Sequence, residues 1–218
     1  MTRVINQTVL ERDVAIPAGK QTIRGTLSMP QEALAVVVFG HGSGSGRYSP
    51  RNRYVAGVLQ EAGLGTLLLD LLEEQEADDR RNVFDISLLA GRLEAAAIWL
   101  AAHDDARGLA LGYFGASTGA GAALLAAARH PAIAGAVVSR GGRPDLASNV
   151  LPRVTAPTRL IVGGDDEVVL ELNREAFDLL TCPRQLDIIP GATHLFPEPG
   201  ALEQVAQLAQ EWFVHYLK

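Results

Sequence analysis

The fold of this chain is decided by the stretch Gly112-Tyr113-Phe114-Gly115-Ala116-Ser117-Thr118-Gly119-Ala120-Gly121. The apolar run over residues 109–114 predicts a buried strand, and an alanine-rich helix over residues 120–129 follows it at once. A serine between glycines at a strand-to-helix corner, Gly-x-Ser-x-Gly, is the pattern of a nucleophile elbow. The corner forces the serine into an unusual backbone conformation that projects its hydroxyl into a cleft. The pattern therefore predicts Ser117 as a catalytic nucleophile.

A structural interpretation competes with this one, because a turn of small residues can simply let a helix pack closely against a strand. Context favours the catalytic interpretation. A strand precedes the serine, a helix follows it, and candidate partner residues come later in the chain in the order that the elbow requires. The N–H of Thr118 stands at the start of that helix, where it can stabilise an oxyanion.

Composition limits the class of protein. With 218 residues, 48% of them hydrophobic, the chain can bury one sizeable core, and we expect a single domain over residues 1–218. The net charge is −6 and no run of Lys and Arg exceeds a pair, so neither nucleic acid nor a membrane is an expected partner. Cys182 is the only cysteine, which rules out an intrachain disulfide, and no Cys/His cluster has the spacing of a zinc site.

The N-terminal residues 1–7 lack the apolar segment of a signal peptide. No apolar run approaches the ~18 residues that a membrane span requires. We therefore expect a soluble, cytoplasmic protein. Neither a metal nor another cofactor is indicated.

Strand-like and helix-like segments alternate along the chain. The expected strands cover residues 8–16, 21–29, 33–39, 65–72, 109–114, 133–139, 158–162 and 185–189. The expected helices cover about 51–62, 86–103, 120–129, 168–180 and 201–216, with one more short helix near Asp145. This alternation, with strands rich in Val and Leu, predicts an α/β fold with a mostly parallel sheet and helices on both faces.

Four segments, in this order, resemble a known fold: Phe39-Gly40-His41-Gly42-Ser43-Gly44, Gly115-Ala116-Ser117-Thr118-Gly119, Gly163-Gly164-Asp165-Asp166-Glu167-Val168-Val169 and Pro190-Gly191-Ala192-Thr193-His194-Leu195-Phe196. Over nearly its whole length the chain resembles the α/β-hydrolase fold and, more narrowly, the dienelactone hydrolase family. The resemblance implies three layers around an eight-stranded sheet, with the nucleophile after the fifth strand and no cap domain.

The general base is expected to be His194, in the loop that leaves the last strand. An imidazole titrates near neutrality, so it can accept the serine proton and later return it to the leaving group. The third member should be a carboxylate after the seventh strand, where Asp165, Asp166 and Glu167 compete. In resembling hydrolases the acid follows a glycine by three positions, which favours Asp166, with Asp165 as the alternative. His41 is interpreted as a structural side chain that organises the turn after it.

The oxyanion hole needs a second N–H beside that of Thr118. The resemblance assigns it to the glycine-rich loop after the third strand, with Ser43 as the expected donor and Gly44 next. Such a loop before a helix could also hold a phosphate. That alternative is weaker, because no lysine stands at the spacing of a phosphate-binding loop.

The chain departs from the family pattern at the elbow, where resembling dienelactone hydrolases carry cysteine and this chain carries Ser117. Hydrolysis of dienelactone itself is therefore not expected, and a serine carboxylesterase acting on small esters is. A shallow, open pocket is expected, edged by Tyr48 and the charged loop 73–81 and favouring short acyl groups. Arg140, which follows the sixth strand, is a candidate for substrate binding.

Two other functions remain open at this stage. A peptidase or an acyltransferase could use the same three residues, and a non-catalytic binding module could share the fold. The module is disfavoured because it has no need to keep a nucleophile, a base and an acid together. The physiological substrate and the oligomeric state are not determined by the sequence.

Overall fold

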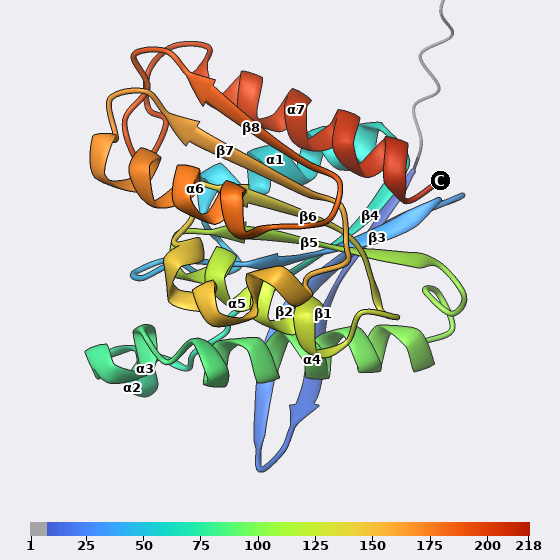
Figure 1. Cartoon of the computed structure of the whole chain (residues 1–218). Coiled ribbons are helices and arrows are strands. Elements are labelled where there is room, and N and C mark those ends of the chain that lie inside the picture. The colour runs from blue at the N-terminus through green and yellow to red at the C-terminus, as the bar shows by residue number, and fades with distance from the viewer. Residues whose placement is uncertain (1–7) are drawn as a thin grey trace, which may run out of the picture.

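Eight strands form one sheet in the order β1-β2-β4-β3-β5-β6-β7-β8 (Figure 1). The computed structural model describes residues 8–218. The strands are β1 (Val9–Ala18), β2 (Gln21–Pro30), β3 (Ala35–Gly40), β4 (Leu64–Leu69), β5 (Ala110–Ala116), β6 (Ala134–Arg140), β7 (Thr158–Gly163) and β8 (Arg184–Ile189). β1 pairs with β2, and β2 with β4, in antiparallel fashion, while all other neighbouring pairs are parallel.

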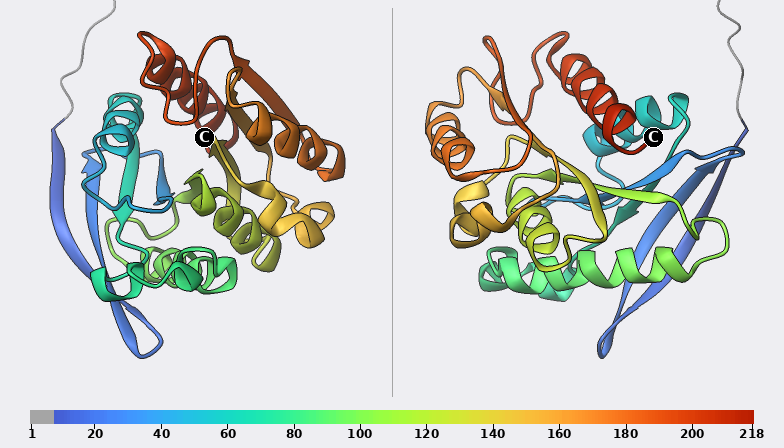
Figure 2. Two further views of the ribbon diagram at one scale, coloured as in Figure 1. Left: turned by 90° about the vertical axis from the view of Figure 1, so that its left-hand side faces the viewer. Right: turned by 45° about the vertical axis from the view of Figure 1, so that its right-hand side comes forward.

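Helices cover both faces of the sheet, which gives three layers (Figure 2). One face carries α1 (Pro50–Glu61) and α7 (Ala201–Tyr216), which pack against each other. The other face carries α4 (Ile86–Ala102), α5 (Thr118–Arg129), the 3₁₀ helix η1 (Pro144–Arg153) and α6 (Glu167–Leu179). Each face has its own buried apolar cluster, and every residue of β3, β4 and β7 is buried, as expected of strands covered on both sides.

The predicted architecture is confirmed. Each expected strand and long helix is present, with ends that differ by a few residues, and the expected short helix near Asp145 is η1. Strand order reverses between β3 and β5, which lie side by side although β4 separates them in the sequence. The loops that leave the carboxyl ends of β3 and β5 therefore meet at a switch point, where ligands bind in open α/β sheets.

One expectation was wrong. Residues 73–81, expected as a charged loop, include the short helix α2 (Glu74–Ala77) and the first two residues of another, α3 (Arg80–Val83). Local capping favours both: the Glu76 carboxylate accepts the N–H of Glu73, and the Asp79 carboxylate accepts the N–H of Arg81. A distant contact then fixes α2 on α4, because Arg92 donates to the Glu76 carboxylate at 2.6 Å and 2.7 Å.

Between β6 and β7, the region where a cap could be inserted, the described chain holds only η1 and short connections. None of the helices in residues 8–218 combines the length and apolar character that crossing a membrane requires.

Candidate active site

Ser117 occupies the corner between β5 and α5 with φ 51° and ψ −123°. A positive φ of this kind is a backbone conformation that residues other than glycine adopt only under strain. The tight corner explains the flanking glycines. A Cβ on Gly115 would lie 2.4 Å from the Cα of Ala120, and one on Gly119 would lie 2.3 Å from the carbonyl oxygen of Gly40. The small residues thus let α5 approach the sheet while the Ser117 backbone is held in its strained form.

His194 and Asp166 are brought together from the loops after β8 and β7. The Nδ1 atom of His194 lies 2.6 Å from Oδ2 of Asp166. An ionised carboxylate can only accept, so Nδ1 carries the proton and Nε2 is left as the acceptor that a general base requires. Asp166 is half-buried and caps α6 by position, yet its side chain makes no capping bond and is available to the imidazole.

Asp165 is placed differently. Its side chain is exposed, and its backbone N–H donates to the carbonyl oxygen of Ala192 at 2.9 Å. Glu167, the first residue of α6, is exposed as well. Of the three acids that compete in the sequence, Asp166 is the one in contact with His194.

The turn at the end of β6 lies between Ser117 and His194. The N–H of Ser117 donates to the carbonyl oxygen of Arg140 at 3.3 Å. The next residue, Gly141, has φ 49°, and a Cβ on it would lie 3.6 Å from Nδ1 of His194. Phe196, two residues beyond the histidine, is the other non-glycine residue with positive φ, at 56°, in the described chain. Backbone strain therefore gathers around this edge of the sheet, as it does at functional sites.

The turn after β3 is held by His41. Its Nδ1 lies 2.9 Å from the carbonyl oxygen of Gly42, and the N–H of Leu71 donates to its Nε2 at 2.8 Å. These contacts define a neutral ring that donates from Nδ1 and accepts at Nε2. Burial lowers the pKa of His41, which favours the same neutral form. His41 has the structural contacts that the sequence indicates.

Gly42 lets this turn lie directly against Ser117, since a Cβ on Gly42 would lie 2.7 Å from the Cβ of Ser117. Ser43 follows and is exposed, while Thr118 begins α5 and is buried. Neither backbone N–H donates to a residue within the described part of the chain. Neither N–H is thus occupied by another residue of the described chain, and their role as oxyanion donors remains a prediction.

Gly42→Ala is expected to lower kcat of the acyl transfer predicted for Ser117 by about 100-fold or more. The added methyl must displace either Ser117 or the turn that presents the Ser43 N–H, and losing one oxyanion donor costs 10²–10³-fold. Steady-state kinetics would measure the loss. Gly57→Ala is the control, because a Cβ at that position of α1 meets nothing within 4 Å. A Gly42→Ala enzyme as active as the Gly57→Ala enzyme would contradict this role for the turn.

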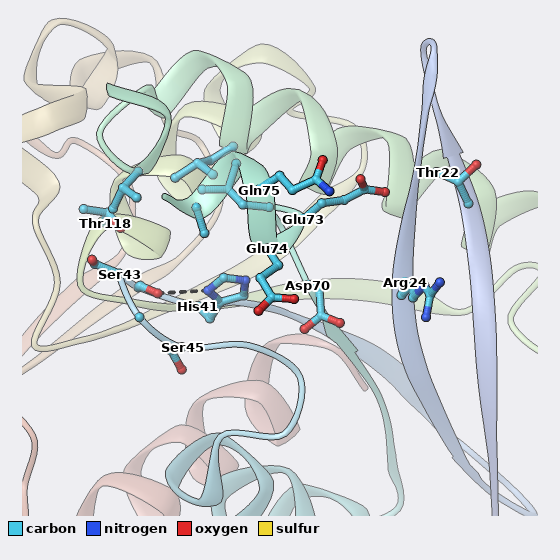
Figure 3. Close-up of a pocket in the computed structure, with 16 residues that line it drawn as sticks. Thr22, Arg24, His41, Ser43, Ser45, Asp70, Glu73, Glu74, Gln75 and Thr118 are labelled. Carbon is cyan, nitrogen blue, oxygen red and sulfur yellow. Dashed lines mark hydrogen bonds between the residues drawn. The ribbon is translucent and has the colours of Figure 1, made fainter. Parts of the chain in front are cut away.

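A cavity of about 590 Å³ opens beside Ser43 and Thr118, which both line it (Figure 3). Its other walls are the segment from the end of β4 through α2, the β1–β2 hairpin, and side chains of α3 and α4. Residues of the segment 73–81, which was expected to edge the pocket as a loop, line the cavity instead as part of α2 and the residue before it. Asp70 also lines it; this residue lies inside the strand predicted over residues 65–72, but β4 ends at Leu69, so Asp70 directly follows the observed strand.

Tyr48 and Arg140 do not line this cavity. Tyr48 is exposed, with the guanidinium of Arg47 4.6 Å above its ring. Arg140 is buried on the α1 side of the sheet, and its Nε and Nη1 have no partner among residues 8–218. Burial, aided by the nearby charge of Arg51, lowers the pKa of Arg140 to about 10. Their roles in substrate binding remain predictions.

In the described residues, no three His, Cys, Asp or Glu side chains are grouped so that they could hold a metal ion. The arrangement offers instead a strained serine, an imidazole oriented by a carboxylate, and two backbone donors. These are the groups that acyl transfer uses.

The sequence profile of the dienelactone hydrolase family matches residues 23–217. The chain belongs to the dienelactone hydrolase family. A crystal structure of a dienelactone hydrolase from Anabaena variabilis is 56% identical and superposes with a TM-score of 0.94, covering 96% of this chain and 99% of that one. Est1E from Butyrivibrio proteoclasticus is 17% identical with a TM-score of 0.81, covering 94% of this chain and 98% of that one, and shares the fold.

A Mycobacterium tuberculosis protein that carries the name of a phosphoribosyl transferase is 56% identical to this family member over 207 residues. The match covers 95% of this chain and 47% of that protein. The chain therefore spans about half the length of this relative.

Proposed function

We propose that this chain is a serine hydrolase that cleaves small carboxylic esters through Ser117, His194 and Asp166. The observation that carries the proposal is the 2.6 Å contact of His194 with Asp166 at the edge of the sheet where Ser117 is held in a strained turn. Membership of a hydrolase family supports it.

The reaction would proceed in two halves. The Ser117 oxygen attacks the ester carbonyl carbon while Nε2 of His194 takes the hydroxyl proton, and the carbonyl oxygen becomes an oxyanion held by the N–H groups of Ser43 and Thr118. When the C–O bond to the alcohol breaks, His194 returns that proton to the leaving oxygen. Water then attacks the acyl-enzyme with the same base, and the acid and Ser117 are released. Asp166 orients the imidazole and stabilises its charged form throughout.

A rapid-mixing experiment with p-nitrophenyl acetate tests the proposal. Accumulation of an acyl-enzyme predicts a burst of nitrophenolate of about one equivalent, followed by slower turnover. Absence of any turnover by the folded protein would favour the binding module. Rates on a peptide bond or transfer to an added alcohol, each compared with the ester, would separate the peptidase and acyltransferase alternatives.

A phosphoribosyl transferase activity is not favoured for this chain. A phosphoribosyl donor carries phosphate groups, and the cavity beside the nucleophile is lined by Asp70, Glu73 and Glu74 with a single arginine, Arg24. Such a lining repels a polyanion. The name of the mycobacterial relative belongs to a protein about twice as long.

Chelation is expected to leave activity unchanged, because the proposed mechanism stabilises the oxyanion with backbone N–H groups alone. Ester turnover would be measured before and after exhaustive dialysis against EDTA. Loss of activity that returns on adding a divalent metal would point to another class of enzyme.

A further inference from the structure

Carboxylates form one wall of the cavity beside Ser43 and Thr118. Asp70, Glu73 and Glu74 line the cavity, and Arg24 is the single cationic side chain among the residues that do so. In the view of Figure 3, Glu74 and Asp70 lie between Ser43 on the left and Arg24 on the right. A ligand that extends from Ser43 and Thr118 through the cavity would meet these carboxylates.

Asp70 has its charge balanced within the protein. Its carboxylate accepts the backbone N–H of Arg47 at 2.8 Å and lies 3.2 Å from Nε of the same residue. Glu73 and Glu74 are exposed, line the cavity and form no ion pair with any residue in the range 8–218. The Glu73 carboxylate also faces the backbone N–H of Glu76 in the capping box of α2. The negative charge of the Glu73 and Glu74 carboxylates is therefore not balanced by a cationic side chain of the described residues.

The helix that carries them is anchored. Arg92, itself buried, donates to both carboxylate oxygens of Glu76 and to the carbonyl oxygen of Leu71. The hydrogen bond from Arg92 lowers the pKa of Glu76, which therefore stays ionised and paired. With Glu76 used as the anchor of α2, Glu73 and Glu74 are left on the cavity side.

In the proposed reaction the cavity would receive the acyl part of the ester rather than the alcohol. The leaving oxygen must lie within hydrogen-bonding reach of His194, which protonates it. No residue of the loops after β7 and β8 lines the cavity, so the cavity lies away from that histidine. Its lining includes apolar Leu72, Val83 and Leu89, and also Thr118, which directly follows Ser117 and whose buried hydroxyl has no partner in the described chain.

We propose that this site selects esters whose acyl group ends in a cationic ammonium group, with Glu73 and Glu74 as the selecting residues. The inference rests on the proposed ester hydrolysis and adds the class of substrate to it. An apolar stretch of the acyl chain would lie against the leucines and the valine, and the charge would reach the acidic wall. An acyl group that ends in a carboxylate would be disfavoured by the same wall.

Three p-nitrophenyl esters with one leaving group test the proposal: the neutral 5,5-dimethylhexanoate, its cationic isostere 4-(trimethylammonio)butanoate, and the anionic glutarate hemiester. Each rate is divided by the spontaneous hydrolysis rate of its ester. We expect kcat/KM for the cationic ester to exceed the neutral value by roughly 10-fold and the anionic value by more, because two carboxylates act at short range in a partly enclosed site. High salt should reduce the preference.

The double variant Glu73→Gln, Glu74→Gln keeps the shape of the wall and removes its charge. The cationic-to-neutral ratio is expected to fall from roughly 10 to within about 2-fold of unity. Glu61→Gln, an exposed change at the end of α1, is the matched control and should keep the ratio. An unchanged ratio in the double variant would overturn the role of these two glutamates.

The outcomes separate the inference from the proposed function. Hydrolysis of the neutral ester with equal or better use of the anionic ester would overturn the inference and leave the esterase standing. If none of the esters were hydrolysed, calorimetric binding of butyltrimethylammonium to the Ser117→Ala protein would decide the inference by itself. Binding that weakens about 10-fold in the glutamine double variant supports it, and no binding overturns it.

Discussion

Ser117→Ala is expected to lower kcat for ester hydrolysis by about 10⁴-fold or more, because residues that act as a unit lose nearly the whole rate enhancement when the nucleophile is removed. The protein should stay folded. The substitution deletes one hydroxyl and keeps the backbone at φ 51°, so the free energy of unfolding should change by less than about 1 kcal/mol. Turnover of p-nitrophenyl acetate and a thermal unfolding curve would measure the two effects.

Ser117→Gly provides a control for the strain at this position. Glycine adopts positive φ without the steric cost that a Cβ brings, so this variant should be as inactive as Ser117→Ala and at least as stable. A Ser117→Ala protein that unfolds at a much lower temperature would show that the lost turnover reflects structure instead of chemistry. Retained turnover in either variant would exclude Ser117 as the nucleophile.

Asp166→Asn is expected to lower kcat by about 10³- to 10⁴-fold, because the imidazole then loses the charge that orients it and stabilises its protonated form. Asp165→Asn removes the same charge one residue earlier from an exposed side chain, and kcat should stay within about 3-fold of the original. Kinetics on the pair would compare two substitutions of identical chemistry. A reversed ranking would assign the acid to Asp165.

The elements of this fold were predictable because each follows a local rule. Buried strands read as continuous apolar runs, and glycines mark the corner at Ser117. The eight-stranded, mostly parallel sheet and the position of His194 after the last strand also followed, since the resemblance covered nearly the whole chain. The close packing at Gly115 and Gly119 explains why that local signal was reliable.

The cavity was not predictable in the same way, because it depends on contacts between residues far apart in the sequence. The pairing of Arg92 with Glu76 converts a charged segment into a helical wall. The link from His41 to Leu71 joins the turn after β3 to the segment after β4. Neither contact can be recognised from the sequence of the segments that it joins, because its two residues are far apart in the chain. A choice between adjacent acids at 165 and 166 likewise depends on which one faces His194, which spacing alone left open.

Covalent labelling with a fluorophosphonate, followed by proteolysis and mass spectrometry, tests the central claim most directly. The reagent phosphonylates a serine only where a base and an oxyanion site activate it, so we predict one adduct per chain, on the peptide that contains Ser117. His194→Ala should react far more slowly. Labelling at another residue, or failure of the active protein to react at all, would contradict the serine mechanism.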